Sequence, residues 1–247
     1  MPSPGTFEER RQSFGAAADL YDAARPSYPA EGVRWMLGNR PLRVIDLGAG
    51  TGIFSRVVAS LGHGVTAVEP DPDMRARFVA GSPGIEVVGG SAEAIPFGDS
   101  TVDAVVAAQA FHWFDNESAL AEIARVLAPG GIFAPIWNTR DESVGWVAVL
   151  AQIVAPGSGV TAAQHARRGR DFGPLFAPPE RAEFRHSTKQ TAEGVLALVR
   201  SRSAYLTAPA EEQRSVDERV RRLVEGLPEP FELPYLTIAF RSAKNAA

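Results

Sequence analysis

Cysteine is absent from the 247-residue sequence. Its absence excludes disulfide bonds, thiolate metal sites and cysteine nucleophiles. Long hydrophobic runs are also absent, because the longest apolar stretch, residues 144–155, is interrupted by Gln152 and is too short to span a bilayer. Residues 1–11 are polar and contain no apolar segment of signal-peptide length. From these absences we expect a cytoplasmic protein without a membrane partner.

Neither sign of charge is in large excess. The 25 Lys and Arg residues against 29 Asp and Glu give a formal net charge of −4, which offers no reason to expect nucleic-acid binding. The sequence contains no internal repeat or low-complexity tract, and 247 residues can bury a substantial core. We therefore expect a globular protein, a monomer or homodimer, with no bound metal.

Glycine, by contrast, is concentrated at one point. Residues 44–47 predict a short buried strand, and Gly48, Gly50 and Gly52 follow it at alternate positions before a helix predicted to begin near Ile53. Glycine lacks a β-carbon, so such a turn can adopt unusual backbone angles and let a ligand approach closely. A strand that runs into a glycine-rich turn and a helix N-terminus is the opening unit of a Rossmann-like nucleotide site.

Apolar segments alternate with amphipathic ones through residue 137. The predicted strands are 44–47, 65–69, 85–88, 102–108 and 132–137, and the predicted helices are 31–37, 53–61, 72–80 and 116–127. This alternation predicts a parallel sheet with helices on both faces, whose ligands bind at the carboxyl ends of the strands. Four segments at such ends should converge on one crevice: 46–52, Glu69, 91–93 and 109–112.

The regular alternation stops after Asn138. Beyond it the sequence predicts helices at 142–154, 192–206 and 210–227, a strand at 184–189, and a final antiparallel strand at 235–241 on the sheet edge. Within one compact domain we distinguish an N-terminal helical lid (1–40) and a cofactor-binding core (41–137). A mostly helical substrate lid with one core strand (138–233) and a final strand with its tail (234–247) follow.

Five segments with ordered spacing carry a family resemblance. Residues 46–52 (Asp-Leu-Gly-Ala-Gly-Thr-Gly) come first, and Glu69 follows about 20 residues beyond the turn, at the end of the second strand. Segments 90–97, 100–103 and 126–131 follow in order, and residues 21–26 add an N-terminal motif. Together they resemble the class I S-adenosylmethionine-dependent methyltransferases, in particular the type 11 small-molecule group, without gaps from about Arg43 to Phe133. The resemblance implies a Rossmann-like, doubly wound α/β fold with a mostly parallel seven-stranded sheet and an antiparallel edge strand.

The resemblance also implies a site for S-adenosylmethionine, with S-adenosylhomocysteine as the product. Asp46 would meet the methionyl tail, Glu69 would accept hydrogen bonds from the ribose diol, and Met74 would pack on the adenine. Ser91 stands where many relatives carry an acid, so adenine contact would depend on the backbone N–H of Ala92. The predicted cofactor-binding residues are Tyr21, Arg25, Tyr28, Asp46, Gly48, Ala49, Gly50, Thr51, Gly52, Glu69, Pro70, Met74, Ser91, Ala92, Glu93, Gln109, Ala110 and Phe111.

His112 is the candidate catalytic residue, because it alone of the four histidines is predicted to lie in the crevice. A neutral imidazole can take a proton from a hydroxyl nucleophile, and the alternative is a positioning role beside the cofactor. Methyl transfer is an in-line displacement, so alignment and desolvation supply much of the acceleration, and a carboxylate acceptor needs no base. The predicted reaction is methyl transfer to an oxygen, hydroxyl or carboxylate, of a small molecule.

Two other functions fit parts of the pattern. A cofactor-binding relative that transfers no methyl group, cyclase-like or regulatory, would share the whole site. An NAD-dependent oxidoreductase would share the strand, turn and helix, but the turn is Gly-x-Gly-x-Gly rather than Gly-x-Gly-x-x-Gly, and no Tyr-x-x-x-Lys pair follows.

The type 11 group includes enzymes of the trans-aconitate methyltransferase type, which methylate a carboxylate. The basic run 165–170 is therefore either a carboxylate clamp or a solvated face.

Overall fold

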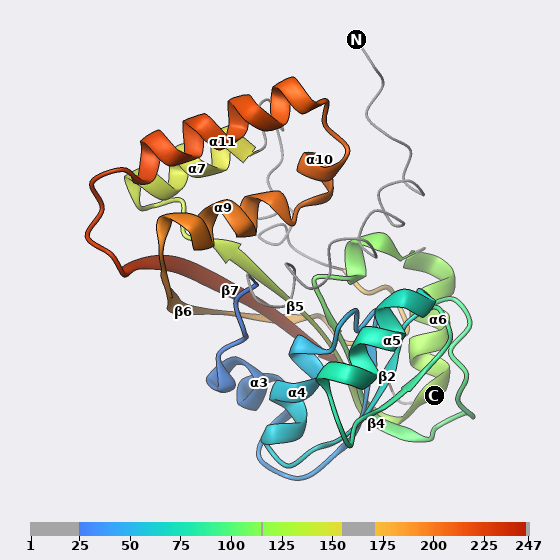
Figure 1. Ribbon diagram of the computed structural model, residues 1–247. Coiled ribbons are helices and arrows are strands. Elements are labelled where there is room, and N and C mark those ends of the chain that lie inside the picture. The colour runs from blue at the N-terminus through green and yellow to red at the C-terminus, as the bar shows by residue number, and fades with distance from the viewer. Residues whose placement is uncertain (1–24, 115, 155–170, 246–247) are drawn as a thin grey trace. The chain divides into compact units, whose positions relative to one another are not determined.

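The computed structural model describes residues 25–114, 116–154 and 171–245, which include a seven-stranded sheet with the order β3-β2-β1-β4-β5-β7-β6 (Figure 1). Neighbouring strands pair in parallel from β3 through β5. The strands are β1 (Arg43–Leu47), β2 (Gly64–Val68), β3 (Glu86–Val88), β4 (Val102–Ala108) and β5 (Leu127–Arg140). This order confirms the doubly wound, mostly parallel sheet that the alternating pattern predicted.

The last two strands are β6 (Glu180–Gln190) and β7 (Phe231–Ala243). Contacts join Thr139 to Leu236 and Asp141 to Pro234, so β7 runs antiparallel to β5. The antiparallel end of the sheet was predicted, but β7 lies one position inside the edge and β6 is outermost. The reason is burial: β7 is buried over most of its length and needs neighbours on both sides, whereas every second residue of β6 is exposed.

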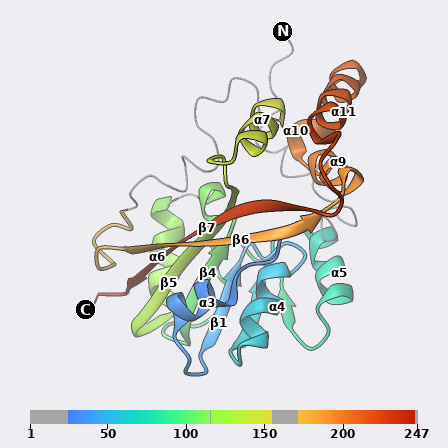
Figure 2. The ribbon, with the colours of Figure 1, turned by 90° about the vertical axis from the view of Figure 1, so that its left-hand side faces the viewer.

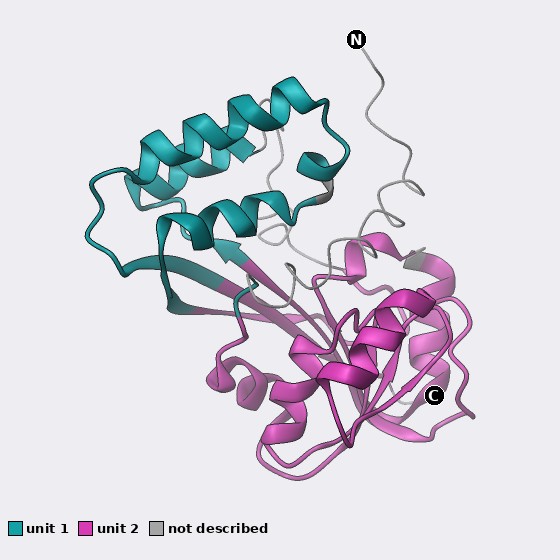
Figure 3. Cartoon of the chain, viewed as in Figure 1, with its two compact units in different colours: residues 1–26, 139–165, 185–236 teal, residues 27–138, 166–184, 237–247 magenta. Residues whose placement is uncertain are grey.

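The chain comprises two compact units, coloured separately in Figure 3. Unit 1 comprises 1–26, 139–165 and 185–236, and unit 2 comprises 27–138, 166–184 and 237–247. Unit 2 contains α3 (Ala30–Leu37), α4 (Ile53–Ser60), α5 (Pro72–Gly81), the 3₁₀ turn η2 (Phe111–Trp113) and α6 (Asn116–Val126). These bounds agree with the predicted helices to within one or two residues. The predicted lids at 1–40 and 138–233 stay predictions.

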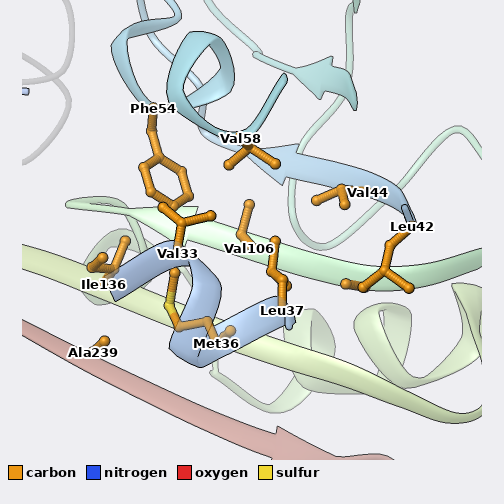
Figure 4. Close-up of a cluster of buried hydrophobic side chains, with 12 residues drawn as sticks. Val33, Met36, Leu37, Leu42, Val44, Phe54, Val58, Val106, Ile136 and Ala239 are labelled. Atoms are coloured by element: carbon orange, nitrogen blue, oxygen red, sulfur yellow. The ribbon is translucent and has the colours of Figure 1, made fainter. Parts of the chain in front are cut away.

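The core of unit 2 forms where α3 and α4 meet the strands. Figure 4 shows Val33 and Met36 of α3 close to Phe54 of α4, above β4 and β5. Periodic apolar residues of α3 and α4 thus bury one stripe of each helix against the sheet. The helix α5 begins where predicted, because the Asp71 carboxylate accepts hydrogen bonds from the N–H groups of Asp73 and Met74, at 2.8 and 3.1 Å.

The fifth strand begins earlier than predicted. The sequence predicts a helix to Leu127 and a strand from Ile132, but β5 starts at Leu127. Val102 pairs with Leu127 and Ala104 pairs with Ile132, so residues 128–131 form an irregular insertion in the ladder. Gly130 lies there at a φ of 72°, a left-handed angle that a glycine tolerates.

Unit 1 contains α7 (Gly145–Val154), α9 (Ala192–Arg200), α10 (Ser203–Leu206) and α11 (Ala210–Val224), and Figure 2 shows these helices from a second side. Leu150 of α7, Val199 of α9 and Val220 of α11 share one apolar cluster. The single helix predicted at 192–206 is wrong: it divides after Arg200. The Ser201 hydroxyl donates to the Leu198 carbonyl oxygen at 2.8 Å and so competes with the helical backbone.

The predicted helix at 142–154 begins only at Gly145, because the Asp141 carboxylate accepts from the N–H of Ser143 at 3.1 Å and holds the preceding turn. Segments predicted within 1–24 and 155–170, including the basic run at 165–170, lie outside the described residues. None of the helices that the structure describes is long and apolar enough to cross a membrane.

Candidate cofactor site

Asp46, near the end of β1, is a fully buried carboxylate with one unsatisfied oxygen. Its Oδ2 accepts a 2.6 Å hydrogen bond from the Ser55 hydroxyl, while Oδ1 has no hydrogen-bond partner among the described residues. Burial raises the pKa of Asp46 to about 7; the Ser55 hydrogen bond opposes this shift, and the Glu69 charge adds to it. A buried carboxylate in this state is suited to a cationic ligand group such as an ammonium.

Glu69 follows β2 and is buried beside the glycine turn. Its Oε2 accepts from the N–H of Gly50 at 2.8 Å, and its Oε1 accepts from the N–H of Asp71 at 3.0 Å. A carboxylate can accept two hydrogen bonds from a ribose diol, which is the role that the sequence predicts for Glu69. In the structure Glu69 joins the glycine turn to the start of α5.

The glycine turn itself provides an open approach to the backbone. Gly50 has a φ of 56°, and a β-carbon built at this residue would have nothing within 4 Å. At Gly52, with a φ of 87°, a β-carbon would lie 2.5 Å from the Ser82 hydroxyl and 2.7 Å from the Phe78 ring. The first glycine thus borders open space, whereas the last permits close packing of the turn against α5.

The segment at residues 91–97 is held by two residues of α6 that sequence reasoning did not identify. Glu122 accepts from the N–H of Ile95 at 3.0 Å, and Arg125 donates to the carbonyl oxygens of Ile95 and Phe97 at 3.0 and 2.8 Å. An ion pair of 2.6 Å joins these two side chains. A charged pair three residues apart on a helix was the available signal, but its backbone partners lie about 30 residues away along the chain.

Beyond β4 the backbone is strained at Gln109. Its φ is 56°, an uncommon value for a residue other than glycine. The structure maintains this angle through two hydrogen bonds: the Gln109 N–H donates to Ile136 O at 2.9 Å, and the Gln109 Nε2 donates to Asn138 O at 2.7 Å. Strain held in this way is typical of functional sites. Ala110, the next residue, is buried.

Phe111 is a core residue. Its ring is 3% exposed and packs against the rings of Phe133 and Phe172, with centroid distances of 5.2 and 5.7 Å. Trp137, Phe172 and Phe176 are buried as well, so they too are core residues. A cofactor contact by Phe111 would therefore come from its backbone.

His112 is exposed, and its Nδ1 accepts a 3.4 Å hydrogen bond from the Trp137 indole N–H. In a neutral imidazole the nitrogen that accepts carries no proton, so the proton resides on Nε2. The basic nitrogen is then the one that faces the indole. This arrangement favours the positioning role of His112 over the role of a base.

The remaining predicted residues divide by unit. Tyr28 packs edge-on against Phe54 with a centroid distance of 4.8 Å, and Arg25 belongs to unit 1. Tyr21 lies outside the described residues. Met74 and Thr51 are buried, and the Pro70 carbonyl oxygen accepts from Arg75 at 2.7 Å. Unit 2 therefore contains every other predicted cofactor residue: Tyr28, Asp46, Gly48, Ala49, Gly50, Thr51, Gly52, Glu69, Pro70, Met74, Ser91, Ala92, Glu93, Gln109, Ala110 and Phe111.

Comparisons with known proteins show the family to which the chain belongs. The methyltransferase domain family matches residues 45–134. The chain is 38% identical over 244 residues to an uncharacterised methyltransferase of Mycobacterium tuberculosis, covering 93% of this chain and 95% of that protein. It is also 36% identical over 133 residues to a malonyl-[acyl-carrier protein] O-methyltransferase of Methylococcus capsulatus, covering 49% of this chain and 48% of that protein. A methyltransferase structure from Anaeromyxobacter dehalogenans matches 89% of this chain and 97% of that chain, with a TM-score of 0.60 and 24% identity.

The fold and the site define a nucleotide-type cofactor enzyme of the Rossmann-like class. The chain belongs to the S-adenosylmethionine-dependent methyltransferases, and S-adenosylmethionine is its cofactor. The residues present fit this molecule, because the unsatisfied oxygen of buried Asp46 suits its ammonium and the open backbone at Gly50 leaves space beside the turn. No cluster of potential metal ligands occurs in the described part of the chain.

We expect Glu69→Ala to weaken S-adenosylhomocysteine binding by about 1–3 kcal/mol, because hydrogen bonds to a charged group are lost. Titration calorimetry at pH 7.5 measures the change, and Glu86→Gln, which removes an exposed charge on β3, is the matched control. An unchanged dissociation constant for Glu69→Ala would remove this residue from the ribose site.

Proposed function

We propose that this enzyme transfers the methyl group of S-adenosylmethionine to an oxygen atom of a small-molecule acceptor. The observation that carries the proposal is the geometry of His112, whose Nδ1 accepts from the Trp137 indole. With that nitrogen engaged, His112 is a poor base, and the proposal therefore favours an acceptor that is already nucleophilic at neutral pH, such as a carboxylate oxygen.

The partial relative from Methylococcus capsulatus supports an oxygen acceptor, because its name describes an O-methyltransferase. That likeness covers about half of each chain. It therefore supports the type of acceptor atom and leaves the acceptor molecule to be identified by experiment.

The protein would contribute alignment and an appropriate electrostatic environment. S-adenosylmethionine supplies a methyl group on a sulfonium, which is reactive without further activation. Asp46 would hold the ammonium of the methionyl tail, and Glu69 would hold the ribose diol. The strained Gln109 backbone, fixed by Ile136 and Asn138, would place its peptide groups beside the reacting centre.

The test is transfer of labelled methyl from S-adenosylmethionine into a small-molecule extract, followed by mild alkali. Methyl esters release their label as methanol under alkali, whereas methyl ethers and N-methyl groups retain it. Alkali-labile label supports a carboxylate acceptor, and alkali-stable label on a hydroxyl oxygen supports the broader oxygen proposal. Label on nitrogen or carbon would overturn the proposal. Cofactor binding without transfer to any fraction would instead favour a non-methylating member of the family.

We expect His112→Gln to lower kcat/KM by less than about tenfold, which is below the roughly hundredfold or more that a general acid or base contributes. The pH profile of kcat should keep its shape, because a positioning residue contributes no titrating step. A loss of more than a thousandfold, together with loss of the acidic limb of the profile, would restore His112 as the base. Thermal unfolding of the variant checks that the fold is intact.

A further inference from the structure

A group of buried and half-buried polar residues in unit 1, Tyr235, Arg140 and Arg202, has no role in the cofactor site. Tyr235 of β7 is 4% exposed, and its hydroxyl has no hydrogen-bond partner among the described residues. A buried hydroxyl without a partner carries an unrecovered desolvation cost, so such groups in native proteins require an explanation. A ligand is one explanation, provided that the surroundings fit it.

Arg140 lies directly across from Tyr235 in the sheet. The Thr139 hydroxyl contacts Leu236 O at 3.0 Å, and the Asp141 N–H contacts Pro234 O at 2.9 Å. In an antiparallel pair these two contacts place the residue between them, Arg140, opposite Tyr235. Opposed residues of an antiparallel pair point to the same face of the sheet, with β-carbons about 5 Å apart.

Arg202, two residues after the end of α9, approaches the same face. Leu198 of α9 packs in one apolar cluster with Tyr235, Leu233 and Val147. The helical turn continues to Arg202, whose N–H donates to Val199 O at 3.2 Å. Arg202 therefore follows Leu198 by four residues and lies on the same side of the turn.

The electrostatics of unit 1 agree with this placement. Burial, the largest cause, and the positive charges of Arg140 and Arg25 lower the pKa of Arg202 to about 9. Burial also lowers the pKa of Arg140, although the charge of Glu142 and the nearby Tyr235 oppose that shift. Burial raises the pKa of Tyr235 despite the three arginines near it, so its hydroxyl keeps its proton and can donate.

Arg140 and Arg202 form no ion pair within the described structure, whereas Arg200, two residues before Arg202, pairs with Asp217, and Arg185 pairs with Asp141. Neighbouring arginines repel one another, and they are stabilised when an anion lies between them. His186 stacks on the Tyr235 ring at a centroid distance of 5.5 Å and so supports its orientation.

We propose that Arg140, Arg202 and the Tyr235 hydroxyl bind an oxyanion, a carboxylate or phosphate, of the methyl acceptor. The guanidinium groups supply charge and paired N–H donors, and the phenol supplies a single donor from the apolar side. The link to the acceptor rests on the proposed function, since it assumes that the enzyme methylates a small molecule. The binding of an oxyanion by these residues does not depend on that assumption.

The test measures binding of simple probes to the full-length protein by calorimetry, in the presence of S-adenosylhomocysteine. The probes are succinate and glutarate as carboxylates, glycerol 3-phosphate as a phosphate, and succinamide as an uncharged analogue. We expect one charged class to bind and succinamide not to bind, and the class that binds identifies the oxyanion. Arg140→Gln and Arg202→Gln should each weaken that binding at least tenfold, and Tyr235→Phe about threefold to tenfold.

The control variant is Arg214→Gln, which removes the same charge from an exposed position on α11 of unit 1. It should leave probe binding unchanged. Arg202→Gln should also raise the thermal midpoint of the ligand-free protein, by about 2–4 °C, because it removes one of several like charges. A lower midpoint with unchanged probe binding would overturn the proposal, as would equal binding of succinamide or equal weakening by Arg214→Gln.

Failure of the proposed function has a separate signature. If the probes bind and the arginine variants weaken them, while no methyl group is transferred to oxygen, the oxyanion site stands and the methyl-acceptor assignment fails. If alkali-labile label forms at the same rate in the wild type and in both arginine variants, the oxyanion proposal fails and the proposed function stands.

Discussion

Replacing Asp46 by Asn is expected to reduce affinity for S-adenosylmethionine by more than about a hundredfold, while it stabilises the ligand-free protein at pH 8. A charge-assisted hydrogen bond to the ligand ammonium is lost, and the amide nitrogen presents a donor to a cation. Both effects originate from the same buried oxygen, Oδ1, which has no partner among the described residues.

The gain in stability follows from the pKa of Asp46, which burial raises from 3.8 to about 7. A carboxyl group whose folded-state pKa is raised contributes most stability below its unfolded-state pKa and loses that contribution as pH rises toward about 7. At pH 8 the folded protein carries the full cost of a buried charge. About three pKa units correspond to about 4 kcal/mol, and the unpaired amide nitrogen of Asn reduces the net gain to about 1–3 kcal/mol.

Denaturant unfolding at pH 8 and pH 5 measures this effect, with Glu86→Gln as the control. The Asp46→Asn advantage should be clear at pH 8 and should shrink toward pH 5. As the pH is lowered from 7, the affinity of the wild type for the cofactor should decrease by up to about tenfold per pH unit, because binding a cation requires the ionised carboxylate. An Asp46→Asn protein that binds the cofactor normally would refute the assignment.

Substitutions of the two glycines Gly50 and Gly52 by alanine are expected to have different effects on stability and on cofactor binding. Gly52→Ala should cost about 2–5 kcal/mol of folding free energy, because it adds left-handed backbone strain to a β-carbon placed 2.5 Å from Ser82 and 2.7 Å from Phe78. Gly50→Ala has the same backbone strain but meets nothing within 4 Å, so it should cost about 1–2 kcal/mol.

Among folded molecules, Gly50→Ala should weaken cofactor binding more than Gly52→Ala does. The methyl group of Gly50→Ala would occupy the open side of the turn, where the cofactor approaches, and should weaken S-adenosylhomocysteine binding at least tenfold. The comparison requires unfolding curves and calorimetry on both variants at a temperature where both are folded. Equal losses of stability in the two variants, or normal cofactor binding by Gly50→Ala, would contradict this account of the turn.

The sequence by itself determined the fold class and the cofactor, because both depend on local signals. Asp46 near the end of its strand, the alternate glycines and Glu69 lie within about 25 residues, and their spacing is set by the geometry of one strand–turn–helix unit. For the same reason most helix bounds in unit 2 were predicted to within one or two residues. At Ser201 the prediction was wrong because a local side-chain hydrogen bond competes with the helix. At the start of β5 and in the position of β7 next to β6, nonlocal strand pairing decided the outcome.

Only the tertiary structure decided the state and the partners of the functional side chains. Burial raises the pKa of Asp46, and no sequence motif encodes that burial. The Trp137 indole N–H donates to His112 Nδ1, although the two residues are 25 positions apart in the sequence. Sequence reasoning sought an anion clamp in the run at 165–170, because neighbouring arginines are visible there. Arg140, Arg202 and Tyr235 are instead far apart along the chain, and pairing of β5 with β7 and packing of α9 bring them to one face. Strand register and helix packing therefore created a charge cluster that no local pattern predicts.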